Sequence, residues 1–242
     1  MNGSLLRVAQ VSKHFGGFSA LSEVSVEIAQ GERFGLIGPN GSGKTTLINC
    51  ISGSLKNDGG SIVFDGSDIS GLPAYQRTRL GIARSFQIPR PFSSMSVLEN
   101  LVVPLEYVVH RRSLHKADTR AEAMQILKSM GLADKADTPS NRLTQVELRK
   151  LELARAMAAR PRLLISDEAM AGLSSTEVEE VLAILRKLND SGITVIMIEH
   201  IMRAVMSFSQ RVICLDAGRI ICEGTPESIV KDPEVQKAYL GA

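Results

Sequence analysis

A glycine-rich run that ends in a lysine and a threonine is the part of the chain whose spacing most directly suggests chemistry. It fits the pattern G-x-x-x-x-G-K-[ST] with Gly38, Pro39, Asn40, Gly41, Ser42, Gly43, Lys44 and Thr45, here called the phosphate loop. Glycines let successive backbone N–H groups turn toward phosphate oxygens, because no Cβ stands in the way. We expect Lys44 to reach the β- and γ-phosphates of a nucleotide and Thr45 to give a hydroxyl to Mg²⁺. The first N–H groups of the following helix, around Thr46, should also face the phosphates. The pattern predicts nucleotide binding but does not distinguish ATP from GTP.

Two adjacent acids, Asp167 and Glu168, follow an apolar run and could complete this site. The run Leu163–Ile165 is typical of a buried strand. If this strand lies parallel to the one that feeds the phosphate loop, Asp167 comes close to Mg²⁺ and binds it directly or through a water. Glu168 then faces the γ-phosphate, where a carboxylate can orient and deprotonate a water. Alone, the pair would be read as a solvated strand end, but the phosphate loop upstream favours the catalytic interpretation.

Strands and helices of suitable length precede and follow the phosphate loop. Residues Arg33–Ile37 predict a buried strand that leads into the loop, and Thr46–Ile51 predict a helix that closes at Gly53. Earlier in the chain, alternating apolar residues predict two half-buried strands joined by a turn at 15–17. These alternating residues are Leu6, Val8 and Val11, then Val24, Val26 and Ile28. A further strand is predicted over Ser61–Phe64.

The last third of the chain alternates strands with helices. Strands are predicted at Leu163–Ile165, Thr194–Ile198 and Val212–Leu215. The helix predicted over Thr176–Asn189 lies between the first two of these strands, and a shorter helical stretch follows His200. This order predicts a parallel sheet with right-handed crossovers.

Between these two parts of the chain the periodicity is helical. Three helices are predicted, over Val97–Tyr107, Ala117–Met130 and Gln145–Ala158. We interpret residues 88–159 as a helical subdomain inserted into a single domain of residues 1–242. Residues 1–87 and 160–242 then form the nucleotide-binding core.

The composition is that of an ordinary globular protein, with 44% hydrophobic and 22% charged residues. The 28 Lys+Arg against 26 Asp+Glu are too balanced to predict nucleic acid binding by bulk electrostatics. The three cysteines have no zinc spacing and are expected to be small apolar residues in a reducing cytoplasm. No apolar run approaches the ~18 residues that a membrane-spanning helix needs, and no secretory signal is expected at the N-terminus.

The order of these motifs resembles that of the ATP-binding cassette (ABC) transporter ATPases over nearly the whole chain. Phe86-Gln87 is similar to the family's Q-loop, Ala171-Gly172-Leu173-Ser174 to its D-loop and Glu199-His200 to its H-loop. The resemblance implies an α/β fold with a P-loop NTPase core. This core has a parallel sheet, an antiparallel β subdomain and an inserted helical subdomain. It also implies ATP and Mg²⁺ as the bound nucleotide and metal.

The resemblance further implies roles for single residues. Phe15 stands where an aromatic residue usually stacks on adenine, although it could also be plain core. Gln87 is implied to sense the γ-phosphate and Mg²⁺, and His200 to contact the γ-phosphate, although each could be structural. Glu168 and His200 are then the catalytic pair. The metal ligands implied are Thr45, Gln87 and Asp167.

Three segments narrow the resemblance to the ATPases of branched-chain amino acid importers. They are Ile82–Gln87, Val97–Asn100 and Asp232–Gly241. Related cassettes for amides or urea share much of this pattern. The resemblance therefore implies an ATP-hydrolysing importer subunit for branched-chain amino acids or related small polar solutes, peripheral on the cytoplasmic face of the cell membrane. Its expected partners are membrane permeases and, indirectly, a solute-binding protein outside the membrane, with no nucleic acid.

One segment departs from the family pattern. Leu143-Thr144-Gln145-Val146-Glu147, here called the signature segment, stands where the family has Leu-Ser-Gly-Gly-Gln. Val146 puts a β-branched side chain where a glycine would let the backbone approach phosphate. Glu147 adds a negative charge near the expected triphosphate. In this family ATP lies between two subunits, and the signature of one faces the phosphate loop of the other. The departure therefore favours a heterodimer with a consensus partner over a homodimer.

Two alternative functions can be compared with the sequence. A nucleotide-binding regulatory subunit with vestigial turnover would explain the signature segment, but the retained Gln87, Glu168 and His200 oppose it. ABC ATPases that act on ribosomes or DNA usually carry tandem cassettes or long coiled-coil insertions, and the sequence has neither.

Overall fold

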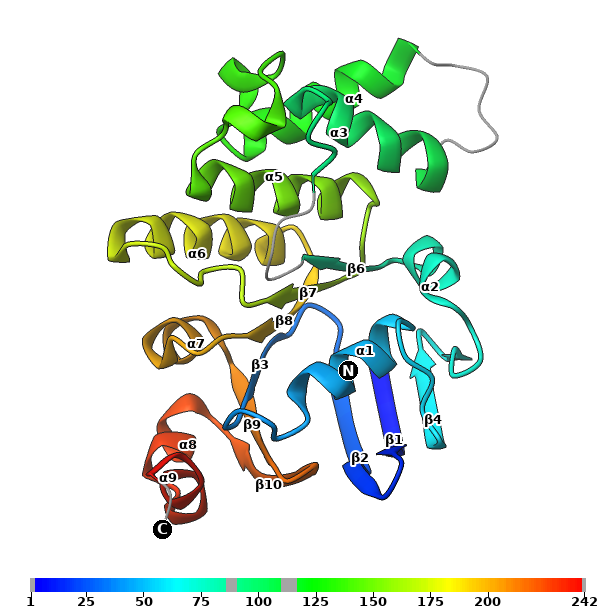
Figure 1. The fold of residues 1–242 in the computed structure, drawn as a ribbon, viewed down its shortest axis with the longest axis vertical. Helices are drawn as coiled ribbons and strands as arrows, with labels where there is room; N and C mark the ends of the chain where they lie inside the picture. The colour runs from blue at the N-terminus through cyan, green and yellow to red at the C-terminus, as the bar shows by residue number, and fades with distance from the viewer. Residues whose placement is uncertain (1–2, 86–90, 110–116, 241–242) are drawn as a thin grey trace.

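A six-stranded sheet forms the centre of the computed structural model, which describes residues 3–85, 91–109 and 117–240 (Figure 1). In the order in which they lie side by side, the strands are β10 (Arg219–Gly224), β9 (Arg211–Asp216), β3 (Arg33–Ile37), β8 (Thr194–Ile198), β7 (Leu163–Asp167) and β6 (Ile82–Ser85). Only the β10–β9 pair of this described sheet is antiparallel. Every residue of β7 and β8 is buried, as expected of strands covered on both faces. The predicted parallel sheet is therefore confirmed.

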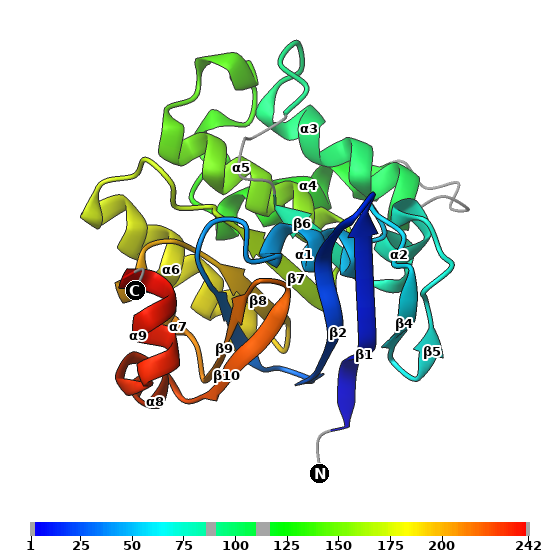
Figure 2. The same cartoon turned by 60° about the horizontal axis from the view of Figure 1, so that its bottom comes forward.

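A second, antiparallel sheet packs beside the first in the order β2-β1-β4-β5 (Figure 2). Its strands are β1 (Ser4–Phe15), β2 (Phe18–Ala29), β4 (Gly59–Phe64) and β5 (Ser67–Asp68). Gln10 and Glu23 have φ of 51° and 53°, where the pairing of β1 with its neighbours shifts register. Such bulges bend a strand and increase its twist. The antiparallel β part was predicted, except for the short β5.

Helix α1 (Lys44–Ser52) follows the phosphate loop and ends at Gly53, whose φ of 78° gives the left-handed C-cap that the sequence predicts. A buried arginine completes this end of the helix. Arg77, on α2 (Ala74–Leu80), donates to the carbonyls of Cys50 and Ile51 at 2.5 and 2.9 Å. Terminal helix carbonyls otherwise lack partners, so Arg77 fixes the end of α1 against α2.

The helical part contains α3 (Val97–Pro104), α4 (Ala117–Ser129) and α5 (Gln145–Ala158). The helix predicted over Val97–Tyr107 is corrected: the α-helix ends at Pro104 and a π-helical turn, η1 (Leu105–Val109), follows. Proline has no N–H to donate to the preceding turn, which explains the change of helix type there. Short 3₁₀ turns, η2 (Ala133–Lys135) and η3 (Ser140–Arg142), connect α4 to α5. The division into subdomains at residues 88 and 159 stays a prediction.

The remaining helices are α6 (Ser175–Asp190), α7 (Met202–Phe208), α8 (Pro226–Lys231) and α9 (Pro233–Leu240). In Figure 2, α8 and α9 lie beside β9 and β10 at the end of the chain. The central sheet separates two apolar cores. One contains residues of α3 to α9, and the other contains residues of α1 and the antiparallel sheet. No helix among the described ranges is long and apolar enough to cross a membrane.

Candidate nucleotide site

The phosphate loop lies between β3 and α1, the position that its mechanism requires. Two of its glycines are needed because of close packing. A Cβ on Gly38, where φ is 147°, would lie 2.1 Å from the Leu215 carbonyl oxygen. A Cβ on Gly43, where φ is 105°, would lie 2.6 Å from the Ala20 carbonyl oxygen. Both positions also have φ values that side-chain-bearing residues rarely adopt, so the loop backbone depends on glycine.

Lys44 is buried under the loop that it belongs to. Its Nζ donates to the carbonyl oxygens of Gly38 and Pro39 at 2.7 and 3.0 Å. Burial lowers the pKa of Lys44, and the nearby Glu168, Cys214 and Asp167 oppose this shift. An ammonium has three protons to donate, so Lys44 can exchange these carbonyls for phosphate oxygens without leaving the loop.

Ser42 provides an independent sign that the loop accepts a polar ligand. Its Oγ is buried and finds no hydrogen-bond partner within the described part of the chain. Buried hydroxyls are nearly always paired in folded proteins. The loop therefore fits a group that brings oxygen atoms, as a phosphate does, and Thr45 at its end adds a hydroxyl suited to Mg²⁺.

Asp167 forms an ion pair that the sequence analysis missed. Arg84, on β6, donates to Asp167 Oδ2 from Nη2 at 2.5 Å and from Nε at 3.2 Å. Arg84 Nη1 also donates to Asn49 Oδ1 on α1 at 2.6 Å. No sequence signal pointed to this pair: β6 was not among the predicted strands, and its pairing with β7, which places residues 84 and 165 side by side, is seen only in the structure. The role of Asp167 as a metal ligand stays a prediction.

The two predicted catalytic residues, Glu168 and His200, lie together. His200 Nε2 and Glu168 Oε1 are 2.9 Å apart. Glu168 has φ of 47°, and its N–H donates to the Ile198 carbonyl at 2.9 Å. A left-handed conformation costs a residue with a side chain about 1–2 kcal/mol. The β7–β8 pairing holds Glu168 in this conformation, which aims its carboxylate at His200.

A cleft of about 290 Å³ joins the phosphate loop to this pair. Glu168 and His200 line it together with residues 40–46 of the loop and helix. Phe15 also lines the cleft, as does Phe18, which the sequence analysis missed. The two rings are 50% and 63% exposed, so both are accessible to a planar base. The adenine-stacking role of Phe15 stays a prediction. The predicted Q-loop residues Phe86 and Gln87 lie outside the described residues.

The signature segment begins α5 and satisfies its own helix end. Thr144 Oγ1 accepts from the Glu147 N–H at 3.4 Å, and Glu147 Oε2 accepts from the Thr144 N–H at 2.8 Å. This capping box, with Lys135 Nζ 3.6 Å from Glu147, gives the carboxylate partners inside the chain. The bond from the Thr144 N–H lowers the pKa of Glu147, which therefore stays ionised at neutral pH. Val146 and Gln145 have no part in the cap.

The predicted D-loop lies next to the signature segment. Gly172 has φ of 79°, and a Cβ there would lie 2.8 Å from Gln145 Nε2. Leu173 precedes Ser174, whose hydroxyl caps α6 by accepting from the Glu177 N–H at 3.4 Å. Ala171 completes the segment, and its carbonyl accepts from Arg149 at 3.2 Å.

Glu199, which the sequence analysis placed in the predicted H-loop without a role of its own, is a buried carboxylate beside His200. Glu199 is 2% exposed, and its Oε1 accepts from the Met170 N–H at 2.9 Å. Burial raises the pKa of Glu199 to about 7, and the nearby Glu168 and Asp167 add to the shift, while Met170 and Arg149 oppose it. Glu199 thus connects the strand end before His200 to the backbone two residues after Glu168.

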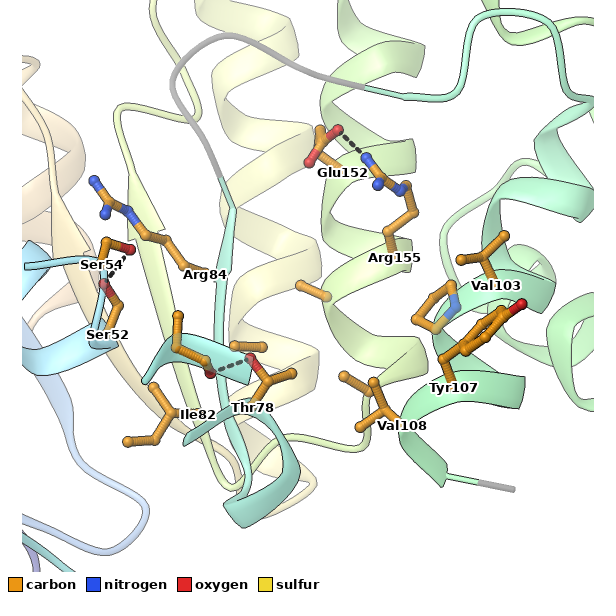
Figure 3. A pocket seen from close by; sticks show the side chains of 15 residues that line it. Ser52, Ser54, Thr78, Ile82, Arg84, Val103, Tyr107, Val108, Glu152 and Arg155 are labelled. Atoms are coloured by element: carbon orange, nitrogen blue, oxygen red, sulfur yellow. Dashed lines mark hydrogen bonds and ion pairs between the residues drawn. The ribbon is translucent and has the colours of Figure 1, made fainter. Parts of the chain in front are cut away.

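A second hollow, of about 350 Å³, lies between the core and the helical part (Figure 3). Mostly apolar residues line it, among them Ile82, Val103 and Tyr107, and Tyr107 is 69% exposed. Arg84 also lines this hollow. Arg84 therefore links this hollow to Asp167, although neither Arg84 nor Asp167 lines the nucleotide cleft itself.

Comparison with known proteins gives the family of the chain. Residues 21–171 match the ABC transporter family, and residues 219–242 match the branched-chain amino acid ATP-binding cassette transporter family. The chain is 36% identical to the high-affinity branched-chain amino acid transport ATP-binding protein BraF of Pseudomonas aeruginosa, over 100% of the chain and 99% of that protein. It is 37% identical to LivG of Escherichia coli, which has the same description, with the same coverage.

Solved structures agree with this assignment. A nucleotide-free ATP-binding cassette from an ABC transporter is 31% identical and superposes with a TM-score of 0.89, covering 99% of this chain and 100% of that one. An ATP-binding cassette of an ABC transporter in its ADP conformation gives 32% identity and the same TM-score and coverage. The fold, the phosphate loop and these matches establish that the chain belongs to the ABC transporter family of ATP-binding cassettes.

Proposed function

We propose that this chain is the ATP-hydrolysing subunit of an importer for branched-chain amino acids or related small polar solutes. The observation that carries the proposal is that Glu168 and His200 meet in the lining of the cleft that the phosphate loop forms. The relatives named for branched-chain amino acid transport, which match over the full chain, support the solute class.

In the proposed mechanism, side chains of this chain bind the phosphates of ATP and orient and deprotonate the attacking water. Lys44 exchanges the Gly38 and Pro39 carbonyls for the β- and γ-phosphate oxygens of ATP. Glu168 accepts a proton from the attacking water, and His200 contacts the γ-phosphate and keeps the Glu168 carboxylate in place. Mg²⁺, when bound, neutralises phosphate charge, and Thr45, Asp167 and Gln87 would hold it.

The ion pair with Arg84 limits how Asp167 could take this role. Its Oδ2 is already engaged twice by Arg84, so a metal would compete with the guanidinium for that oxygen. Oδ1 has no bond to Arg84 in the described part of the chain, and it could accept from a metal-bound water while the ion pair stays. The ion pair is therefore compatible with a water-mediated contact to Mg²⁺.

We place the permease contact at the apolar hollow between the core and the helical part (Figure 3). Its lining is mostly apolar, and the exposed Tyr107 ring at its edge is the kind of side chain that anchors protein interfaces. A permease segment with apolar side chains would fill it. Such a segment would touch Arg84, so docking would reach the predicted metal ligand Asp167 through the Arg84–Asp167 ion pair.

The second ATPase subunit is proposed to be a different chain. The signature segment offers Val146 and a charged Glu147 where the family offers a glycine and a glutamine. The phosphate loop and Glu168 are complete. A partner with a consensus signature would therefore form one good site with this chain. A regulatory subunit with weak turnover is the second candidate, and the signature segment is the feature that favours it.

Purification from membranes tests the proposal. The tagged chain should bring down permease chains and a second cassette, and the complex should hydrolyse ATP faster when the solute and its binding protein are present. A Tyr107→Asp variant, which charges the edge of the hollow, should lose the permeases while keeping MgATP binding. Recovery of the chain from the soluble fraction without any membrane protein would contradict the importer function.

A further inference from the structure

The last helix of the chain reaches the first residue of the phosphate loop. Tyr239, near the end of α9, accepts a hydrogen bond through its Oη from the Gly38 N–H at 2.8 Å. Gly38 is the first residue after β3, and the pairing of β3 with β9 stops one residue earlier, at Ile37 and Cys214. The tyrosine hydroxyl therefore supplies an acceptor at the point where the sheet no longer provides one.

Both backbone polar groups of Gly38 are thus held by side chains. Its N–H donates to Tyr239, and its carbonyl accepts from Lys44 Nζ at 2.7 Å. Lys44 must release this carbonyl to reach a phosphate, but nothing in phosphate binding requires Tyr239 to let go. When the lysine moves, the tyrosine becomes the contact that still fixes the start of the loop.

The local sequence explains how α9 delivers the hydroxyl. Asp232 caps the helix by accepting from the N–H groups of Glu234 and Val235 at 2.9 and 3.1 Å. Cys222 Sγ, on β10, donates to the other Asp232 oxygen at 3.1 Å and ties this cap to the sheet. Val235 is 4% exposed and packs in the core. Val235 and Tyr239 are four residues apart, so they share one face of the helix. A capped start and a buried valine therefore aim the tyrosine at the loop.

We propose that the C-terminal segment 232–239 braces the phosphate loop through Tyr239, and that this brace sets the affinity of the loop for nucleotide. Tyr239 is a positioning residue, because it touches the loop backbone and does not line the nucleotide cleft. This inference rests on the proposed function, since it assumes that the loop binds MgATP. It gives a role to the segment Asp232–Gly241, which the sequence singled out and the catalytic site does not use.

Tyr239→Phe tests the brace because it removes only the hydroxyl oxygen. A net hydrogen bond of this kind corresponds to a roughly 3- to 10-fold change in an equilibrium constant. We expect the dissociation constant for MgATP, measured by calorimetry on the full chain, to rise by roughly that factor. We also expect the Gly38 amide to exchange its proton with deuterated water faster in the variant, with or without nucleotide. A purely structural tyrosine would lower the melting temperature without either effect.

Matched variants separate the possible outcomes. Tyr75→Phe removes an exposed hydroxyl whose partner among the described residues is Gln76, so it should change neither the affinity nor the exchange at Gly38. Asp232→Ala removes the cap of α9 and should change both in the same direction as Tyr239→Phe. If the parent chain binds MgATP and Tyr239→Phe changes neither the MgATP affinity nor the proton exchange at Gly38, the brace is wrong but the proposed function stands. If the parent chain bound MgATP no more tightly than the Lys44→Ala variant does, the proposed function would be overturned together with this inference.

Discussion

Replacing Glu199 by glutamine should change how the stability of the fold depends on pH. Glu199 is 2% exposed, and burial raises its pKa from an ordinary 4.5 to about 7. An acid whose pKa is raised on folding binds its proton more tightly in the folded chain than in the unfolded one. Its contribution to stability is therefore complete below pH 4.5 and is lost as the pH rises to 7.

The size of this loss follows from the shift. At 1.36 kcal/mol for each unit of pKa, the free energy of unfolding of the parent should fall by about 3 kcal/mol across this range, relative to a variant that cannot ionise. Glutamine has nearly the same shape, and its amide oxygen can still accept from the Met170 N–H. Arg149, Glu168 and Asp167 also act on Glu199, but they are unchanged in the variant. The comparison therefore isolates the charge of residue 199.

Urea unfolding of the nucleotide-free chain at several pH values from 5 to 8 measures the effect. The parent and Glu199→Gln should be closest at pH 5, and the variant should gain on the parent up to about pH 7, with the difference levelling off toward pH 8. Glu177→Gln is the matched control, because hydrogen bonds from Ser174 lower the pKa of Glu177. The free energy of unfolding of the parent should fall toward that of this variant only below pH 4.5, so the two should run parallel from pH 5 to 8. Parallel curves for Glu199→Gln and the parent from pH 5 to 8 would refute the reasoning.

Three further outcomes follow from the nucleotide site and the signature segment. Lys44→Ala should weaken MgATP binding by roughly 10-fold or more, because it removes a charged donor to the phosphates; calorimetry with unchanged affinity would contradict the phosphate-loop interpretation. Glu168→Gln should slow hydrolysis at least ~10²-fold and leave MgATP binding largely intact; equal turnover with the partner present would exclude Glu168 as the base. In the Glu168→Gln background, Gln145→Gly, Val146→Gly and Glu147→Gln together should increase the ATP-dependent homodimer seen by size-exclusion chromatography. A chain that already dimerises fully with ATP would show that the signature segment is tolerated.

The sequence predicted those elements that have a strong local signal. Strands β3 and β8 and helix α5 have the predicted bounds, because buried apolar runs and the Thr144 cap mark their ends. The helix over Val97–Tyr107 was predicted too long, because the apolar periodicity continues past Pro104 although the hydrogen-bond pattern changes there. Helices α8 and α9 were not predicted as elements: they have only 6 and 8 residues, too few for a clear period.

The site was predicted as a set of residues but not as a set of contacts. The motifs named Lys44, Asp167, Glu168 and His200, and the structure brings Glu168 and His200 within 2.9 Å of each other. The Arg84–Asp167 pair joins residues 83 positions apart, and the Tyr239–Gly38 bond joins residues 201 positions apart. Such contacts depend on strand order and helix docking, which no local pattern encodes.

The capping box at the start of α5 shows which residues of the signature segment are needed to fold the helix end. Folding uses the Thr144 hydroxyl and a residue at position 147 that can accept from the Thr144 N–H, and glutamine would serve as well as glutamate in that position. Glu147 therefore adds nothing to the cap that a glutamine would not, and Val146 has no part in it. The cap requires neither the negative charge of Glu147 nor the side chain of Val146, so we expect these departures from the family pattern to matter for what approaches the helix end from outside. A negative charge and a branched side chain there would oppose a triphosphate held by a second copy of this chain, which is the arrangement that the homodimer experiment tests.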